Sequence, residues 1–393
     1  MATLLESVEL IKPAGSGVSR PSSNRGVIES ATPEWLDRGQ IPCLDGLRAI
    51  AIGLVLLVHS SRTIGFPESP VLHRFARHGH IGVDIFFVIS GFLITTLLAR
   101  ELERTGEVNL KRFYVRRFLR IIPAYIALLI AVAACQAAGR IQVPSRDWIA
   151  AMTYTTNFLF HPSWELGHTW SLSVEEHFYC LWPVALSVAG IVGGWRVALV
   201  CIVGCWGLRC FIALGLPLLV SPETVSFYSA LAENSTFTRL DTISMGCLVA
   251  LASRSDFWRG CLDRLTRPAF LVGYVVIIGA ALELGAISKF HHCVYYTLSG
   301  TCIGLLMWGL IQSEGLPRRI LSNRILRTIG IGSYSIYLWQ QLVIHPRQVG
   351  WIHAFPQNIV LTLGVACLSF WLIEQPFNRL KDRVANRMPT VSA

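Results

Sequence analysis

Residues 81–92 read Ile-Gly-Val-Asp-Ile-Phe-Phe-Val-Ile-Ser-Gly-Phe, and the apolar run continues to residue 99. Asp84 is the one ionisable side chain in this stretch. A helix of this length is long enough to cross the hydrocarbon core of a bilayer, which is roughly 30 Å thick. The segment therefore predicts a transmembrane helix.

Similar apolar segments recur along the whole chain of 393 residues, which is 53% hydrophobic and only 15% charged. Soluble domains carry about 25% charged residues. The mean hydropathy of +0.51 agrees with this difference and excludes an ordinary soluble globule. We therefore predict an all-α fold, a polytopic membrane helix bundle of about ten transmembrane helices near residues 47–65, 81–99, 121–138, 172–191, 195–216, 238–253, 268–287, 293–312, 329–346 and 357–375.

Basic residues predict the orientation of this bundle. If the N-terminus is cytoplasmic, the inside segments hold 25 of the 34 Lys and Arg. Such an excess follows the positive-inside rule, so both termini are expected in the cytoplasm of a multi-pass protein of the cell inner (plasma) membrane. The expected organisation is a flexible cytoplasmic N-terminal tail at 1–40, a membrane domain at 41–380 and a cytoplasmic C-terminal tail at 381–393.

Cysteine and histidine patterns argue against a metal centre. Most of the 11 cysteines lie in apolar runs, where cysteine behaves as a small hydrophobic residue. The loop histidines lack a carboxylate framework, so no metal is expected. The net charge of +10 is explained by topology, and no basic stretch interleaved with aromatic residues indicates a nucleic-acid partner.

Arg48 and His59 lie 11 residues apart in the first predicted span. At about 100° per residue they share one helix face, separated by about 16 Å along the axis. Ionisable side chains inside a span are expensive and usually functional. A snorkelling arginine and a structural histidine are the alternative interpretation.

Asp84 and Ser90 are the polar side chains of the second span. Asp84 is expected at a depth similar to that of His59, where a carboxylate would fix the tautomer of the imidazole. Alternatively, Asp84 caps a helix, and Ser90-Gly91 marks a close helix crossing.

Three arginines, Arg116, Arg117 and Arg120, run into the third predicted span. Arg117 and Arg120 are three residues apart and share one face. Two guanidinium groups at the cytoplasmic end of a bundle suit bidentate phosphate binding. Lipid headgroup binding or simple anchoring remains the alternative.

The fourth span opens with a polar segment, His168-Thr-Trp-Ser171-Leu-Ser173-Val-Glu175-Glu176. Adjacent carboxylates point about 100° apart on a helix, so at most one of Glu175 and Glu176 is expected to face a site with Ser171 or Ser173. Arg239 and Asp241, at the start of the sixth span, are weaker candidates of the same kind.

Taken in order, these segments resemble the acyltransferase-3 family of integral membrane acyl-CoA-dependent O-acyltransferases. The resemblance covers residues 41–380 and is carried by Asp45-Gly46-Leu47-Arg48 with ten residues to His59, the segment 82–92, Arg117-x-x-Arg120, the segment 170–176, Arg239-x-Asp241, the segment 333–339 and Glu374-Gln375-Pro376-Phe377.

This resemblance implies a ten-helix bundle that moves an acyl group, usually acetyl, from acyl-CoA to a hydroxyl group of a glycan or of a small secondary metabolite such as a macrolide. It implies no resident cofactor, and its partners are acyl-CoA, the hydroxyl acceptor and membrane lipids. The chain resembles the stand-alone form, without a fused hydrolase-like domain. One position departs from the family pattern: where histidine often follows Tyr-Leu-Trp, this sequence has Gln340-Gln341, so no catalytic role is assigned there.

The expected mechanism binds the donor phosphates on Arg117 and Arg120, with Arg116, and passes the pantetheine arm toward His59. His59, oriented by Asp84 or Glu175, then acts as a general base on the acceptor hydroxyl or as a covalent acceptor of the acyl group. The expected catalytic residues are His59, Asp84, Glu175 and Glu176, and the expected substrate-binding residues are Arg48, Arg116, Arg117, Arg120, Ser90, Ser171, Ser173, Arg239 and Asp241.

A proton-coupled secondary transporter is the alternative from another class, because Arg48, His59, Asp84 and Glu175 would also suit a proton path. Such transporters often carry matching interrupted helices in two halves. No matching pair is visible here, which favours the transferase.

Overall fold

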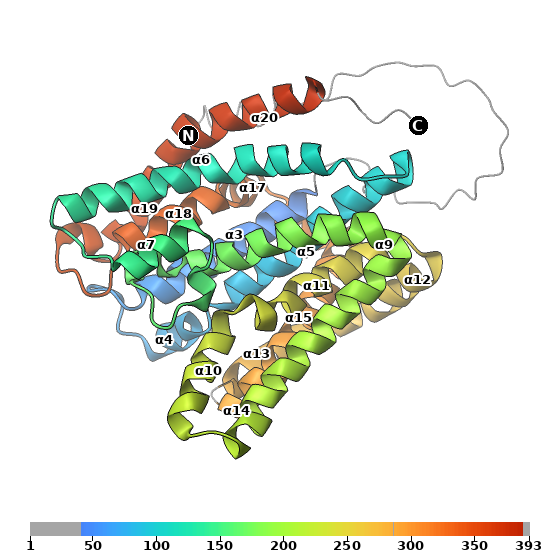
Figure 1. The fold of residues 1–393 in the computed structure, drawn as a ribbon, viewed down its shortest axis with the longest axis horizontal. Helices are drawn as coiled ribbons and strands as arrows, with labels where there is room; N and C mark the ends of the chain where they lie inside the picture. The colour runs from blue at the N-terminus through green and yellow to red at the C-terminus, as the bar shows by residue number, and fades with distance from the viewer. Residues whose placement is uncertain (1–40, 286, 388–393) are drawn as a thin grey trace.

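The structure is a computed structural model that describes residues 41–285 and 287–387, and this part of the chain contains helices and no strand. Figure 1 shows a bundle whose long helices lie side by side. The main helices are α3 (Pro42–Ser60), α4 (Pro70–Arg77), α5 (Ile81–Thr105), α6 (Leu110–Ala137), α7 (Ser145–Met152), α8 (Trp164–Gly167), α9 (Thr169–Cys210), α10 (Pro222–Asn234), α11 (Thr236–Ala252), α12 (Asp256–Leu265), α13 (Pro268–Leu284), α15 (Tyr296–Gln312), α16 (Leu316–Leu321), α17 (Arg324–Ile331), α18 (Ser333–Val343), α19 (Gln357–Ser369) and α20 (Gln375–Arg387).

The prediction of an all-helical membrane protein is confirmed, because six helices in the described residues are long and apolar enough to cross a membrane. A seventh candidate is the bent pair α12 and α13, whose axes differ by 70°. Each of the ten predicted spans overlaps one or more helices. The count of ten and the orientation of the termini stay predictions.

One long helix, α9, covers two of the predicted spans. Gly190 within it has φ 65° and ψ −175°, which is not helical, so two arms meet there. A positive φ suits glycine because it has no Cβ. Figure 1 shows the second arm turning back along the bundle after this point. The break therefore allows one helix to supply both spans.

Two predicted spans differ from simple membrane-crossing helices. The segment 329–346 is divided into α17 and α18, which meet at Gly332, and the 11 residues of α18 are too few to cross roughly 30 Å at about 1.5 Å per residue. The segment 238–253 becomes α11, where all but four of the 17 residues are buried. Helix α11 is thus an interior helix surrounded by others.

A close helix crossing lies between α5 and α11. A Cβ on Gly91 would overlap the carbonyl oxygen of Ile243, and one on Gly246 would overlap that of Val88. Small residues let membrane helices approach until their backbones touch. The interpretation of Ser90-Gly91 as a close crossing is therefore confirmed, and this crossing fixes where Ser90 lies.

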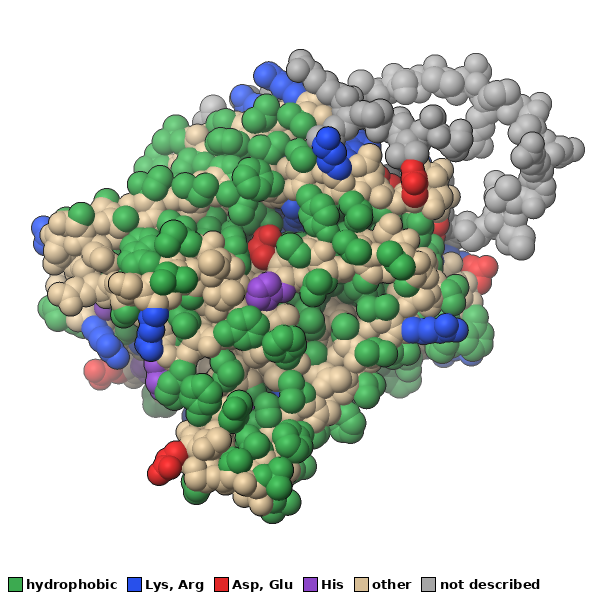
Figure 2. All heavy atoms as spheres, viewed as in Figure 1, with side chains coloured by type: hydrophobic (Ala, Val, Ile, Leu, Met, Phe, Trp, Pro, Cys, Tyr) green, Lys and Arg blue, Asp and Glu red, His purple; other side chains and the backbone are tan. Residues whose placement is uncertain are grey.

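Many apolar side chains lie exposed on the outer surface. Figure 2 shows green side chains over most of the viewed face, with most charged side chains toward its ends and edges. Exposed apolar residues on long helices include Ile130, Val188 and Val276. A surface of this kind suits contact with lipid rather than water.

The predicted tails fall largely outside the described residues. Residues 1–40 and 388–393 are not described, so the expected N-terminal tail stays a prediction. Residues 381–387 belong to α20, which follows α19 through one π-helical turn at Phe370–Glu374. Helix α20 packs along α6, as Figure 1 shows.

The α5–α11 crossing gives a test of the packing. Gly91→Ala is expected to lower the free energy of unfolding by about 1–3 kcal/mol, because the added methyl group forces two backbones apart. Thermal unfolding of the purified protein in detergent measures this. Gly273→Ala on α13 is the matched control, because a Cβ there meets open space. A Gly91→Ala protein as stable as Gly273→Ala would contradict the described crossing.

Candidate active site

A pocket lies between the helices of the bundle. Helices α3, α5, α6 and α18 and the first arm of α9 supply its walls. The residues that line it are Arg48, Val83, Phe86, Phe87, Ser90, Arg117, Arg120, Ile121, Ser171, Leu172, Glu175, Glu176, Tyr179, Ser333, Tyr334 and Tyr337. Seven residues predicted for the site therefore lie in one pocket, and they come from the four helices α3, α5, α6 and α9.

Three arginines give this pocket a cationic wall. Arg48 comes from α3, while Arg117 and Arg120 come from α6. The guanidinium carbon of Arg117 lies 4.3 Å from the ring centre of Tyr179, which holds it by a cation–π contact. Nε of Arg48 is buried without a hydrogen-bond partner among the described residues. Arg116, the fourth predicted cation, does not line the pocket.

Both carboxylates of the fourth predicted span line the pocket. Ser90 donates a hydrogen bond of 2.6 Å to Oε1 of Glu175, which links α5 to α9. Glu176 lines the same space. The prediction that at most one of the two faces the site is wrong, because the pocket covers enough of the helix surface to reach two side chains about 100° apart.

The two predicted serines on α9 have different surroundings. Ser171 lines the pocket and lies 2.6 Å from the hydroxyl of Tyr337. Ser173 is buried and donates to the carbonyl of Thr169 at 3.0 Å, within its own helix. Ser171 thus faces the pocket, while Ser173 satisfies its hydroxyl locally.

His59 lies beyond the Tyr337 wall of the pocket. Tyr337 donates to the carbonyl of His168 at 2.9 Å, and Nδ1 of His168 lies 2.9 Å from Oε1 of Gln341. Nε2 of Gln341 is in turn 3.5 Å from Nε2 of His59. A continuous chain of polar contacts therefore runs from the pocket to His59.

The side chain that contacts Nδ1 of His59 is Gln340, at 2.5 Å. Trp164 lies against the same imidazole edge-on, with ring centres 5.3 Å apart. The hypothesis that Asp84 or Glu175 orients His59 is wrong, because each carboxylate binds elsewhere. Depth alone suggested the pairing, and depth does not determine which helices are neighbours.

Asp84 and Arg239 form a buried ion pair between α5 and α11. Tyr295 donates to the second oxygen of Asp84 at 3.2 Å, and the guanidinium carbon of Arg239 lies 4.0 Å from the ring centre of Tyr296. Neither member of the pair lines the described pocket. Their expected roles in catalysis and binding stay predictions, while the geometry gives them a role in joining two helices.

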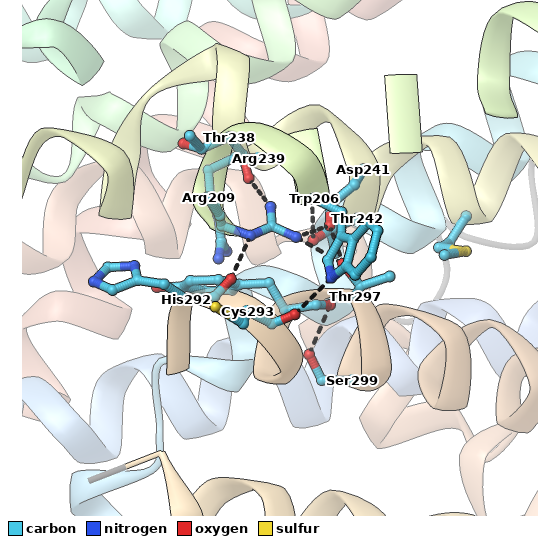
Figure 3. Close-up of polar contacts among 12 residues, drawn as sticks. Trp206, Arg209, Thr238, Arg239, Asp241, Thr242, His292, Cys293, Thr297 and Ser299 are labelled. Atoms are coloured by element: carbon cyan, nitrogen blue, oxygen red, sulfur yellow. Dashed lines mark hydrogen bonds and ion pairs between the residues drawn. The ribbon is translucent and has the colours of Figure 1, made fainter. Parts of the chain in front are cut away.

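Asp241 belongs to a second buried network, shown in Figure 3. Nη2 of Arg209 donates to Asp241 at 2.6 Å and to the hydroxyl of Thr297 at 2.6 Å, while Nε donates to the carbonyl of His292 at 2.9 Å. Arg209 and Asp241 are both fully buried. This network joins α9, α11 and α15 and leaves Asp241 outside the pocket.

Sequence reasoning assigned no role to several residues of this region. Tyr334 and Tyr337 are polar aromatic residues of the segment 333–339. His168 is the first residue of the polar segment 168–176 that opens the fourth predicted span. Gln340 and Gln341 depart from the family pattern, so the sequence predicts no catalytic role for them. Two carboxamides in an apolar segment were themselves a signal, since buried amides require partners. In the described residues, no group of three or more His, Cys, Asp or Glu is placed to hold a metal ion.

The pocket holds guanidinium groups and carboxylates, and polar contacts connect it to a histidine. Such groups inside a helical membrane protein are the parts of a membrane-embedded group-transfer site. The family model described as "Acyltransferase domain" matches residues 41–374, which include all of these side chains. The chain belongs to this family, acyltransferase-3, and the resemblance noted from its motifs is confirmed.

The relatives of this chain include named O-acetyltransferases. A protein of Staphylococcus aureus strain COL, provisionally named an O-acetyltransferase, is 31% identical over 387 residues, covering 89% of this chain and 59% of the relative. The peptidoglycan O-acetyltransferase OatA of Listeria monocytogenes is 29% identical, covering 87% and 56%. The O-acetyltransferase OatA of S. aureus strain NCTC 8325 is 27% identical, covering 86% and 57%. The chain thus spans less than two thirds of these relatives, and no solved structure matches it.

Asp84 provides a test that separates structural from chemical roles. Asp84→Ala is expected to lower the free energy of unfolding by about 3–5 kcal/mol, because it leaves the Arg239 cation buried without its partner. Adding Arg239→Leu is expected to restore part of this loss. Thermal unfolding in detergent measures both.

Asp382→Ala is the control, because that carboxylate is 62% exposed and its ion pair with Lys381 contributes about 0–1 kcal/mol. An Asp84→Ala protein of normal stability but without activity would contradict the structural role.

Proposed function

We propose that the protein is an inner (plasma) membrane O-acyltransferase that moves an acyl group, acetyl in the default case, from cytosolic acyl-CoA to a hydroxyl group of a glycan. Membership of the acyltransferase family and the names of the relatives support this class of reaction. The donor, the acceptor and the direction of transfer are parts of the proposal.

The observation that carries the proposal is the pocket that places Arg48, Arg117 and Arg120 in the same cavity as Ser171 and Tyr337. From Tyr337 the polar contacts continue through His168 to His59. The arginines lie at the predicted cytoplasmic end and His59 toward the opposite side. This arrangement suits a reaction whose two substrates arrive from different sides of the membrane.

Acyl-CoA carries three phosphate groups and a flexible pantetheine arm. Guanidinium groups bind phosphate oxygens bidentately, so Arg117 and Arg120, with Arg48, are placed to hold the nucleotide end. Arg116, one residue along α6, would add positive potential at the rim. The apolar and aromatic wall of Phe86, Phe87 and the tyrosines then suits the thioester arm.

The chemistry proposed for His59 is removal of the proton from the acceptor hydroxyl. The oxygen attacks the thioester carbon, the carbon–oxygen bond forms, and the carbon–sulfur bond breaks to release coenzyme A. Direct acylation of His59 before transfer is the other course that the same geometry supports. In this proposal Glu175 or Glu176, which both line the pocket, orients the acceptor, and Ser171 supplies a hydrogen bond.

A glycan is the preferred acceptor because a relative is named a peptidoglycan O-acetyltransferase. An exported sugar cannot meet cytosolic acyl-CoA unless the acyl group passes through the membrane. A small secondary metabolite such as a macrolide is the alternative acceptor.

Release of free thiol from acetyl-CoA by the purified protein tests the proposal, with peptidoglycan-derived oligosaccharides as acceptor. His59→Ala is expected to lower the rate by at least about 100-fold, the usual minimum for a lost general base. The double variant Arg117→Ala, Arg120→Ala is expected to raise KM for acetyl-CoA by about 10-fold or more, since each charge-assisted hydrogen bond contributes about 1.5–3 kcal/mol.

Arg319→Ala is the matched control, because this exposed arginine on α16 does not line the pocket. Near-normal thiol release by His59→Ala would contradict the assignment of His59. The wild-type protein is measured both alone and with the oligosaccharide. If it releases no thiol from acetyl-CoA and acetyl-CoA does not raise its thermal stability, the donor assignment is wrong. The hypothesis of a proton-coupled transporter then regains support.

A further inference from the structure

Two consecutive glutamines at the end of α18, Gln340 and Gln341, contact both ring nitrogens of His59 from one side. Oε1 of Gln340 lies 2.5 Å from Nδ1, and Nε2 of Gln341 lies 3.5 Å from Nε2. The two glutamine side chains are buried, with 0% and 5% of their surface exposed. Because α18 and α3 are far apart in sequence, only the fold brings these groups together.

Gln340 determines which nitrogen of His59 carries the proton. A carbonyl oxygen only accepts hydrogen bonds, so in the neutral imidazole the proton must sit on Nδ1. Nε2 is then left with a lone pair and faces Gln341. His59 is therefore held in the tautomer whose Nε2 can accept a proton.

Gln341 is held in place by the start of α9. Its Oε1 accepts the backbone N–H of His168, the residue immediately before α9, at 3.1 Å. This contact directs its amide nitrogen toward His59. A separation of 3.5 Å is longer than the usual 2.7–3.2 Å of an N–H hydrogen bond, so this N–H is only weakly used.

Trp164 closes the other side of this group. Its indole N–H donates to the carbonyls of Gln341 at 3.1 Å and of Ile344 at 2.9 Å, while its ring lies against His59. The three side chains of His59, Gln341 and Trp164 are thus fixed relative to one another. A fixed donor beside a reactive nitrogen needs no rearrangement when charge develops there.

We infer that the two glutamines complete the transfer site: Gln340 positions His59, and the amide N–H of Gln341 donates a hydrogen bond to the oxyanion of the tetrahedral intermediate. This rests on the proposed function. Nε2 of His59 takes the acceptor proton as the new carbon–oxygen bond forms, and the thioester carbonyl oxygen becomes the oxyanion beside Gln341. When this oxyanion collapses, the carbon–sulfur bond breaks and the proton on His59 passes to the departing thiolate.

Replacement of each glutamine by glutamate separates the two roles. At position 340 the glutamate keeps an oxygen to accept from Nδ1 of His59 and loses no hydrogen bond, because Nε2 of Gln340 has no partner among the described residues. At position 341 the glutamate keeps the oxygen that accepts from His168 but deletes the N–H donor. Both changes add the same charge, so each is the other's control.

The experiment measures kcat and KM for acetyl-CoA by thiol release with the oligosaccharide acceptor. Gln340→Leu is expected to lower kcat by about 10–100-fold with KM unchanged, the usual cost of losing a residue that orients a reactive side chain. Gln340→Glu is expected to restore most of that rate. Gln341→Glu is expected to lower kcat by about 100–1000-fold, the usual cost of deleting an oxyanion donor.

Gln348→Leu is the control, because this glutamine lies outside the site, and it is expected to leave kcat and KM for acetyl-CoA unchanged. Thermal unfolding checks that every variant folds. Equal tolerance of glutamate at both positions would overturn the donor role of Gln341, and full activity of Gln340→Leu would overturn the positioning role of Gln340. If Gln340→Leu does not fold, the two glutamate variants are compared instead. An equal loss of kcat in Gln340→Glu and Gln341→Glu would overturn the separate roles of the two glutamines. Measuring His59→Ala alongside distinguishes the failures, because an active His59→Ala protein rejects the proposed function as well.

Discussion

A charged side chain among membrane helices must be satisfied inside the protein, and the structure depends on how its buried cations meet this constraint. Arg239 and Arg209 are each paired with an aspartate, Asp84 and Asp241, and these pairs tie α11 to its neighbours. Arg48, Arg117 and Arg120 form no ion pair with a described residue and instead line a pocket. The arginines that are paired with an aspartate hold the bundle together. The arginines without such a pair are available to an anionic substrate.

Much of the fold could be predicted from the sequence because membrane helices need long apolar runs, and these runs are visible in one dimension. The segments that became α3, α5, α6 and α15 were predicted as helices, although α3 begins five residues before the predicted 47–65 and α6 begins at Leu110 rather than at residue 121. Breaks were harder to predict, since Gly190 divides α9 by one backbone conformation and Gly332 separates α17 from α18. Neither effect changes the hydropathy on which the ten spans were based.

The candidate site was predictable where spacing along one helix decides the outcome. Arg117 and Arg120 share a face of α6, and both reach the pocket. The partners of His59 were not predictable, because they come from α18, 281 residues away in sequence. Gln340 is a carboxamide at a position where the family pattern often has histidine, and only the packing of α18 against α3 reveals its contact.

We propose that the donor binds at the arginine end of the pocket, that this end faces the cytoplasm, and that the acyl group leaves from the opposite side. Membrane vesicles of known orientation test this most directly, with acetyl-CoA outside and the oligosaccharide acceptor enclosed. Thiol release is predicted from vesicles whose cytoplasmic face points outward, together with acetylation of the enclosed acceptor, and not from intact vesicles of the opposite orientation. Equal thiol release from both kinds of intact vesicle, or acetylation only when donor and acceptor share one side, would contradict the account.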